Sequence, residues 1–185
     1  MSILPEKYLF IVGSCVQPAK IGHFTDEERF NQTIRTLENI RERVPGAIIL
    51  FIDASVRTMT QEQKNKLTNR ANYAIDISNN PVVRQLSEHG QQSLAETVLL
   101  MNALHLLKNN PQFNRLLPSI KGIFKITGRS ILNEKFDVSE YSDVFGKFVF
   151  KKRIPTWMAG GEISHLLITR LYYICPSLID KYMEF

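Results

Sequence analysis

The chain has 185 residues, of which 44% are hydrophobic and 22% are charged, and it carries a net charge of +5. This composition is typical of a single globular domain, and it excludes a disordered or fibrous chain. A domain of this size buries roughly 70% of the surface that its unfolded chain exposes, so it needs no metal or disulfide to fold. The net charge by itself does not distinguish between nucleic acid, an anionic membrane and a phosphate-bearing ligand.

The cysteine content and the first residues favour a cytoplasmic protein. Cys15 and Cys175 each lie within an apolar run, which indicates buried free thiols rather than a disulfide and fits a reducing compartment. Residues 1–15 lack the basic segment and the long apolar segment of a signal peptide. No window holds the roughly 18 consecutive apolar residues that a membrane span requires, so we expect no transmembrane segment.

The first quarter of the chain predicts a strand, a helix and a second strand. Residues 8–16 and 47–52 are apolar runs typical of strands that are buried on both faces. Between them, Thr25 and Glu28 form a capping-box pattern, which predicts the start of a helix. Pro45-Gly46 predicts its end, and one face is apolar at helical spacing, at Phe30, Ile34, Leu37, Ile40 and Val44.

The middle of the chain predicts two short helices, a third strand and a long helix. Thr60 and Gln63 form a second capping box, followed by a short polar helix to about residue 70. Residues 73–77 predict a strand, and residues 82–88 a short helix after the break at Asn79-Asn80-Pro81. A long helix is expected over residues 92–108, with an inner side formed by Leu94, Val98, Met101 and Leu104 or His105.

The last third completes a three-layer α/β domain. Strands are predicted at residues 120–126, 147–153 and 166–174, and Pro176 opens a terminal helix. Alternating strands and helices followed by two late strands predict one domain over residues 1–185, an α/β/α sandwich with a mostly parallel, Rossmann-like sheet. Ligands of such sheets bind beyond the carboxyl ends of the strands, here residues 14–16, 53–55, 77–79 and 127–130.

Several common active sites are excluded by their motifs. The chain has no G-x-G-x-x-G after the first strand and no P-loop, which argues against a dinucleotide fold and a P-loop enzyme. It has neither H-E-x-x-H nor C-x-x-C, so no zinc site is indicated. The G-x-S-x-G motif of hydrolases is missing too.

The most informative stretch is the end of the strand at residues 120–126. Gly128 follows this strand and would let a phosphate-bearing ligand approach the backbone. Lys125 supplies a point charge, and Arg129 supplies a planar group that can bind two phosphate oxygens. The alternative interpretation is a strand-to-turn junction with two solvated cations.

Three other features have both a functional and a structural interpretation. Lys151, Lys152 and Arg153 would bind a phosphate or an acceptor beside a stacking Trp157, or they protect a sheet edge from pairing. Asp53, at the end of the second strand, would hold a ribose hydroxyl or form a turn. Glu96, on the long helix, faces either the cleft or the solvent.

These segments together resemble the GT-A family of nucleotide-sugar glycosyltransferases. The likeness lies in the first strand, in a second strand ending in Asp-Ala-Ser, in an Ala-Glu pair before an apolar helix, and in F-K-I-T-G-R. It is closest to short viral and phage-type members with a strand ending in K-[IL]-[ST]-G-R. Those members are also similar to this chain in F-V-F-K-K-R-x-P-x-W and T-R-L-Y-x-x-x-x-S-L-I-D, here residues 148–157 and 169–180.

The resemblance implies a donor site and an activity. It places Ser14 and Asp53 beside the nucleoside, and Lys125, Gly128 and Arg129 beside the donor diphosphate, with Lys152 and Arg153 as further donor contacts. The implied reaction moves a sugar from a nucleotide-diphospho-sugar donor to a glycan hydroxyl. An inverting enzyme also needs a carboxylate base near the acceptor, and Glu96 and Asp180 are the two candidates.

The chain departs from this family at the metal site. Many GT-A enzymes hold Mn²⁺ or Mg²⁺ with an Asp-x-Asp motif after the fourth strand, whereas this chain has Thr127-Gly128-Arg129 there and no D-x-D motif. We expect Lys125 and Arg129 to neutralise the diphosphate without a metal. The alternative is an Mn²⁺ or Mg²⁺ ion held weakly by an isolated acid such as Asp76 or Asp137.

Two rival interpretations remain open at this point. The first is a nucleotide- or single-stranded nucleic-acid-binding module without catalysis, in which Phe148, Phe150 and Trp157 form a stacking platform. Because these aromatic residues alternate within an apolar strand, they resemble core residues, and we expect no nucleic-acid partner. The second is a partial or degenerate domain with a structural role.

Overall fold

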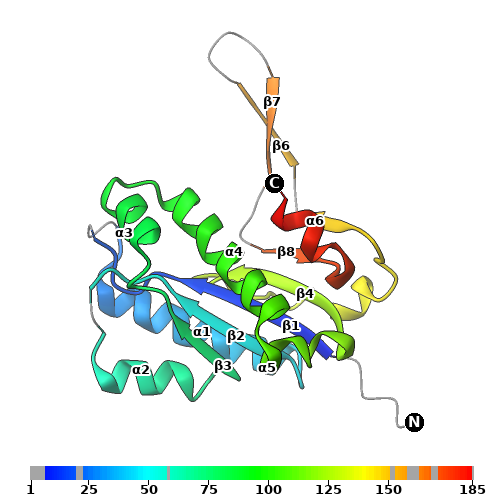
Figure 1. Ribbon diagram of the computed structural model, residues 1–185, viewed down its shortest axis with the longest axis horizontal. Helices are drawn as coiled ribbons and strands as arrows, with labels where there is room; N and C mark the ends of the chain where they lie inside the picture. Colours follow the sequence, from blue (N-terminus) through cyan, green and yellow to red (C-terminus); the bar gives the residue numbers. More distant parts are fainter. Residues whose placement is uncertain are drawn as a thin grey trace.

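The computed structural model describes residues 7–19, 23–57, 59–150, 153–157, 163–167 and 171–184. For residues 92–93, 150, 153–157 and 163–167 it describes the backbone alone. One six-stranded sheet forms the centre of the described chain, with the order β3-β2-β1-β4-β8-β5 (Figure 1). Four of its strands are mutually parallel, namely β1 (Lys7–Ser14), β2 (Ile48–Asp53), β3 (Tyr73–Asp76) and β4 (Ile120–Thr127).

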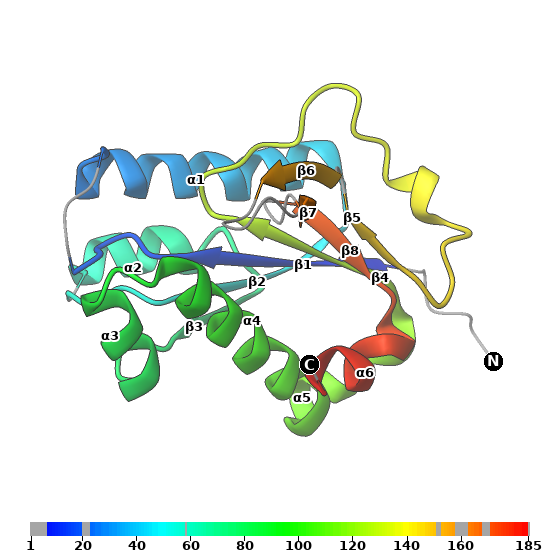
Figure 2. The ribbon, with the colours of Figure 1, turned by 90° about the horizontal axis from the view of Figure 1, so that it is seen from above.

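Helices cover both faces of this sheet (Figure 2). One face packs against α1 (Asp26–Arg43) and α2 (Gln61–Thr68). The opposite face packs against α3 (Pro81–Glu88), α4 (Gln92–Asn109), α5 (Pro111–Asn114) and α6 (Ile179–Met183). The described chain also contains short 3₁₀ helices at η1 (Leu117–Ser119), η2 (Val138–Tyr141) and η3 (Pro176–Leu178). The three-layer α/β/α sandwich with a mostly parallel sheet is therefore confirmed.

The predicted boundaries of α1 hold because local hydrogen bonds fix them. The Thr25 backbone amide donates to Glu28 Oε2 at 2.8 Å, and the Glu28 amide donates to Thr25 Oγ1 at 3.2 Å. This reciprocal pair satisfies amide groups that the first helical turn leaves without partners. At the other end, Gly46 adopts a φ of +83°, a left-handed conformation that glycine takes readily. The predicted inner face of α1 is buried at Phe30, Leu37, Ile40 and Val44.

The predicted inner face of α4 is confirmed at Leu104, which is fully buried, and is wrong at Leu94. Leu94 is 54% exposed, whereas Ala95 and Leu99 are buried against the sheet. The helix is apolar around most of its circumference, so its hydrophobic period does not define one face. Small side chains decide the orientation, since Ala95 and Ala103 let the helix backbone approach the strands closely.

Both late strands were predicted too long. Residues 147–153 divide into β5 (Phe148–Phe150) and β6 (Arg153–Trp157), and the second predicted strand corresponds to β7 (Ile163–Leu167) and β8 (Leu171–Ile174). β8 lies antiparallel to β4, and β5 lies antiparallel to β8. β6 and β7 pair only with each other, as a separate two-stranded sheet. The alternating pattern identifies extended chain but does not show where that chain leaves one sheet for another.

The strand order reverses beside β1, which positions the candidate site. The chain adds β2 and β3 on one side of β1 and then crosses the other face of the sheet through α3 and α4 to place β4 on the opposite side. The carboxyl ends are level in register, because Ser14 pairs with Asp53 and Gly13 pairs with Thr127. Crevices at such reversals are the usual ligand sites of open α/β sheets.

Candidate functional site

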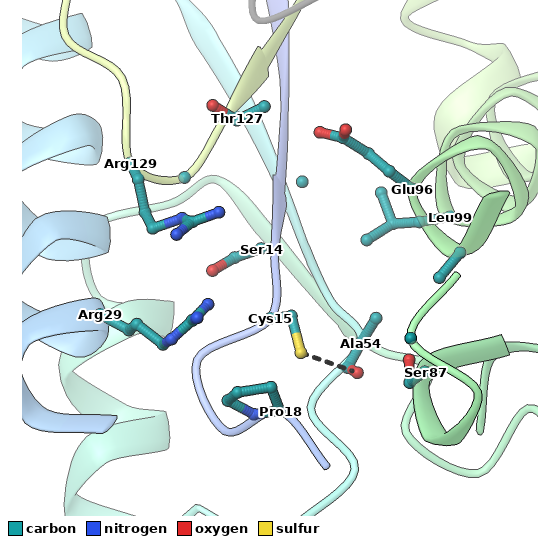
Figure 3. Close-up of a pocket in the computed structure, with 14 residues that line it drawn as sticks. Ser14, Cys15, Pro18, Arg29, Ala54, Ser87, Glu96, Leu99, Thr127 and Arg129 are labelled. Atoms are coloured by element: carbon teal, nitrogen blue, oxygen red, sulfur yellow. Dashed lines mark hydrogen bonds between the residues drawn. The ribbon is translucent and has the colours of Figure 1, made fainter. Parts of the chain in front are cut away.

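A cavity of about 280 Å³ opens at this reversal, between the carboxyl ends of β1 and β4 (Figure 3). Its floor is formed by the ends of the strands, with Ser14 and Cys15 after β1 and Thr127 after β4. α1 contributes one wall, and the segment from α3 into α4 contributes the facing wall. The volume is close to the lower end of the range of small-molecule sites.

Two arginine side chains enter the cavity from the α1 side. Arg129, in the turn after β4, is exposed, and its guanidinium carbon lies 5.8 Å from the ring centre of Phe24. Arg29, in the first turns of α1, is only 6% exposed, and its Nε donates to Phe24 O at 3.3 Å. Figure 3 shows both guanidinium groups directed inward with Ser14 between them. The two guanidinium groups therefore place positive charge at the carboxyl ends of β1 and β4, beside α1.

A short chain of buried hydroxyl groups links the end of β1 to the backbone of Arg29 in α1. Thr33 Oγ1 donates to Arg29 O at 2.9 Å, and its oxygen lies 3.0 Å from Ser14 Oγ. Because the Thr33 hydrogen is used for Arg29, Ser14 is the donor in the second bond. The end of β1 is therefore tied to the helical turn that carries Arg29. Ser14 lines the cavity, as expected, and has this positional role in addition.

Gly128 lines the cavity, and the structure gives a packing reason for it. Its amide donates to Gly13 O at 2.7 Å, which continues the pairing of β4 with β1 past the end of the strand. A Cβ atom at this position would lie 2.9 Å from Ser14 Cβ and 2.9 Å from Ser14 Oγ. A side chain would therefore displace Ser14, whatever ligand the cavity binds.

Glu96 and Lys125 form an ion pair on the α4 side. Glu96 lines the cavity with its side chain 34% exposed, whereas the Lys125 side chain is 3% exposed and lies behind it. The Lys125 ammonium contacts the Glu96 carboxylate and lies 5.8 Å from the centre of the Tyr172 ring. Burial lowers the pKa of Lys125, and the Glu96 charge opposes that shift. The structure therefore directs the Lys125 charge to Glu96, and Lys125 is not part of the cavity wall, contrary to the expected diphosphate contact.

Asp53 is buried beneath the cavity and binds the backbone. Its two carboxylate oxygens accept hydrogen bonds from the amides of Val16, at 3.3 Å, and Ser55, at 3.0 Å. It joins the loops that follow β1 and β2 and is only 1% exposed. Burial raises the pKa of Asp53 to about 6, although the hydrogen bonds from Ser55 and Val16 counteract part of the shift.

We expect the Asp53 carboxyl carbon to titrate near pH 6 in a carbon-detected NMR experiment. Since the folded pKa is raised above the unfolded value of about 4, the folded state binds more protons between these values. The free energy of unfolding should therefore decrease as pH rises from 4 to 6, by about 3 kcal/mol from this group. Asp53→Asn serves as the control, because it removes the titrating group. A midpoint near 4 in the wild-type protein would contradict the assignment.

The remaining predicted residues lie apart from the cavity. Asp180, on α6, binds Lys108 Nζ at 2.5 Å, near the far end of α4 from Glu96. Lys108 follows Glu96 by twelve positions in α4, which corresponds to roughly 18 Å along the helix axis. The two carboxylates proposed as a base thus occupy different parts of the domain. Lys151, Lys152 and the side chains of Arg153, Phe150 and Trp157 fall outside the described residues.

The described part of β5 does not form an open stacking platform. Phe148 is half-buried, and its ring centre lies 5.5 Å from that of Tyr182 on α6. It packs against the apolar core beneath α4. Phe148, one of the aromatic residues of the rival nucleic-acid interpretation, therefore belongs to the core.

The two acids considered for a metal also lie away from the cavity. Asp76 binds Lys64 Nζ at 3.2 Å, and Asp137 accepts the Ser139 amide at 2.8 Å at the start of η2. Among the described residues, no cluster of three or more His, Cys, Asp or Glu side chains is arranged to hold a metal ion. Independence from metal remains a prediction.

Sequence reasoning missed Arg29 because it treated α1 by its apolar positions alone. Arg29, Thr33 and Thr36 are all buried at a spacing of i, i+4 and i+7, so they form a polar stripe beside the apolar one. This spacing of polar residues is the signal in the sequence from which Arg29 could have been identified. Cys15, within the predicted strand end at residues 14–16, lines the cavity and donates to Ala54 O at 3.5 Å. Burial raises the pKa of this thiol to about 12, so it is neutral and not suited to act as a nucleophile.

None of the helices in the described residues combines the length and the apolar character that a membrane crossing requires. No protein-family model matches the chain, and no curated protein matches it in sequence.

Two solved mannosyltransferase structures are similar to the chain in fold. Core-mannan synthase A from Aspergillus fumigatus, in an Mn/GDP form, is 10% identical with a TM-score of 0.33; the match covers 80% of this chain and 43% of that one. The mannosyltransferase Ktr4p from S. cerevisiae is 12% identical with a TM-score of 0.35, and the match covers 83% and 40%. This chain thus spans about two-fifths of those proteins. At this level the similarity carries no argument about activity.

Proposed function

We propose that the chain is a glycosyltransferase that binds a nucleotide-diphospho-sugar in the cavity between β1 and β4. One observation carries the proposal: Arg29, Arg129 and Glu96 converge on one cavity at the point where the strand order reverses. A nucleotide-sugar has a diphosphate, which suits guanidinium groups, and sugar hydroxyls, which suit a carboxylate. The resemblance of the F-K-I-T-G-R and F-V-F-K-K-R segments to short GT-A enzymes agrees with this assignment.

In the proposed reaction, the arginines act on the leaving group and Glu96 acts on the acceptor. The bond between the anomeric carbon and the diphosphate oxygen breaks, and a bond forms between that carbon and a glycan hydroxyl oxygen. Arg29 and Arg129 stabilise the negative charge that develops on the departing diphosphate. Glu96 takes the proton of the hydroxyl as general base, held in position by Lys125.

The proposed enzyme uses arginine charge where many related enzymes use a metal. Two guanidinium groups together carry about the charge of one divalent cation. These groups would repel a divalent cation beside them. Among the residues that line the cavity, Glu96 supplies the one carboxylate that could bind such a cation. The alternative is a site for Mn²⁺ or Mg²⁺ that forms with the substrate phosphates.

The direct test is release of nucleoside diphosphate from a panel of nucleotide-sugars, with and without oligosaccharide acceptors. The proposal expects release with at least one sugar donor, and faster release when a suitable acceptor is added. Glu96→Gln should reduce the rate while leaving binding of the nucleoside diphosphate unchanged. The proposal fails if nucleotides bind but no donor in the panel is turned over, because the chain is then a binding module.

We expect Arg129→Ala to weaken binding of nucleoside diphosphates by about 10- to 100-fold. A charge-assisted hydrogen bond of this kind contributes about 1.5–3 kcal/mol. Arg129 is exposed in the turn after β4, so the fold should be retained. Isothermal titration in excess EDTA, and again with millimolar Mn²⁺, measures both the affinity and the role of metal. A tenfold tighter binding with Mn²⁺, about 1.4 kcal/mol, would contradict the metal-independent proposal.

A further inference from the structure

The side chain of Arg29 is buried and forms one hydrogen bond to a described residue. Arg29 is 6% exposed, and its single hydrogen bond to a described residue runs from Nε to Phe24 O at 3.3 Å. Within the described ranges, neither terminal nitrogen of the guanidinium group donates to an acceptor. Figure 3 shows this end of the side chain directed into the cavity beside Ser14.

Four acidic residues near Arg29 in the chain or around the cavity bind other groups, and Glu27 is exposed on α1. Asp26 binds Arg57 at 2.7 Å, and Glu28 closes the capping box with Thr25. Asp53 accepts the amides of Val16 and Ser55. Glu96, across the cavity, binds Lys125. No carboxylate among the described residues therefore forms an ion pair with Arg29.

A buried guanidinium group without an oppositely charged partner among the described residues is unfavourable for the protein alone. Arginine stays protonated in proteins, so it does not escape the cost by losing its proton. Taking a charge out of water is costly unless a partner compensates it. The same planar group binds two oxygens of a phosphoryl group at once, which satisfies both terminal nitrogens.

The electrostatic field in the cavity agrees with two cations acting at one place. The charges of Arg29 and Arg129 both act to lower the pKa of the Cys15 thiol, although burial dominates and raises it. The two guanidinium groups flank Ser14 on the same wall. Two neighbouring cations on one wall suit two neighbouring phosphoryl groups better than one.

We infer that Arg29 and Arg129 together bind a diphosphate, with one guanidinium group for each phosphoryl group, and that Arg29 supplies the larger part of the affinity. Arg29 has the larger share because its charge is less screened by solvent than that of exposed Arg129. The inference rests on the proposed function for the identity of the donor, but the anion site itself is testable with pyrophosphate.

The test compares Arg29→Met, Arg29→Lys and Arg129→Met with Arg35→Met, in titrations of inorganic pyrophosphate and orthophosphate in EDTA at low salt. Arg35 is an exposed residue of α1, so its variant removes the same charge from the same helix without altering the cavity. Arg29→Met should weaken pyrophosphate binding at least tenfold and more than Arg129→Met does. It should leave the melting temperature of the unliganded protein unchanged or higher. Arg29→Lys should show an intermediate loss, and Arg35→Met a loss below twofold.

The inference is overturned if pyrophosphate does not bind, if orthophosphate binds as tightly as pyrophosphate, or if Arg29→Met and Arg35→Met bind it equally. It is also overturned if Arg29→Met lowers the melting temperature while affinity is unchanged, since Arg29 is then structural. Should Arg29→Met not fold, the loss in Arg29→Lys decides. If pyrophosphate binding depends on Arg29 but no nucleotide-sugar is bound, the anion site stands and the proposed function fails. If a nucleotide-sugar binds equally to the wild type and to Arg29→Met, the proposed function stands and the inference about Arg29 fails.

Discussion

Replacing Gly122 with alanine is expected to lower the free energy of unfolding by about 3 kcal/mol. A Cβ atom at this position of β4 would lie 2.1 Å from Tyr173 Cε2 and 2.9 Å from Tyr173 Cζ. The Tyr173 ring is buried, and its centre lies 5.4 Å from that of Phe124 and 5.5 Å from that of Tyr141, so any shift would disturb these contacts. The Tyr173 hydroxyl also donates to Lys121 O at 3.2 Å.

Overpacking of this kind costs about 3 kcal/mol or more, a large part of the stability of a small domain. Urea unfolding followed by circular dichroism measures the loss. Gly90→Ala is the matched control, since nothing lies within 4 Å of its added Cβ and the cost is limited to its φ of +75°. That cost is about 1–2 kcal/mol. Equal losses in the two variants would contradict the packing of Tyr173 over Gly122.

The second large effect concerns the pair formed by Glu96 and Lys125. Glu96→Gln should lower the free energy of unfolding by about 3 kcal/mol, because it leaves a nearly buried ammonium group without its counter-ion. The double variant Glu96→Gln with Lys125→Met should recover most of this loss, since methionine fills a similar volume without a charge. Chemical unfolding of the wild type, both single variants and the double variant gives the coupling free energy.

The Glu96→Gln variant should also gain stability as pH rises toward about 10. Its folded state lowers the pKa of Lys125 below the unfolded value, so the unfolded state binds more protons between the two values. The free energy of unfolding therefore increases with pH in this range. A double variant that is no more stable than Glu96→Gln, or a single variant without this pH dependence, would show that Lys125 is not a buried charge paired with Glu96.

Much of the fold was predictable because single segments encode it. The apolar runs that became β1, β2 and β4 are short and bounded, and the capping boxes at Thr25 and Thr60 fixed the starts of α1 and α2. The inner face of α4 was not predictable in the same way. Its side chains are apolar on several faces, so its contacts with neighbouring strands decide which of them are buried.

The site was predicted in part, for a related reason. The ends of β1 and β4 were correctly brought together, since the carboxyl ends of parallel strands share one edge of the sheet. A residue's closeness to that edge does not show which face of the sheet its side chain points to. Lys125 lies on the face of β4 that packs on α4, so it binds Glu96, whereas Arg129 lies past the strand and reaches the cavity. Arg29 comes from α1, outside the strand ends from which the site was predicted.

The most direct test of the central claim is an NMR titration of isotope-labelled protein with the nucleoside diphosphate that binds most tightly, in EDTA. If the cavity between β1 and β4 is the nucleotide site, the largest changes in amide chemical shift should map to Ser14, Cys15, Gly128 and Arg129, and to the turn at Gly90. The same residues should respond to the matching nucleotide-sugar. Changes confined to residues 147–157, or no saturable change with any nucleoside diphosphate, would contradict the account.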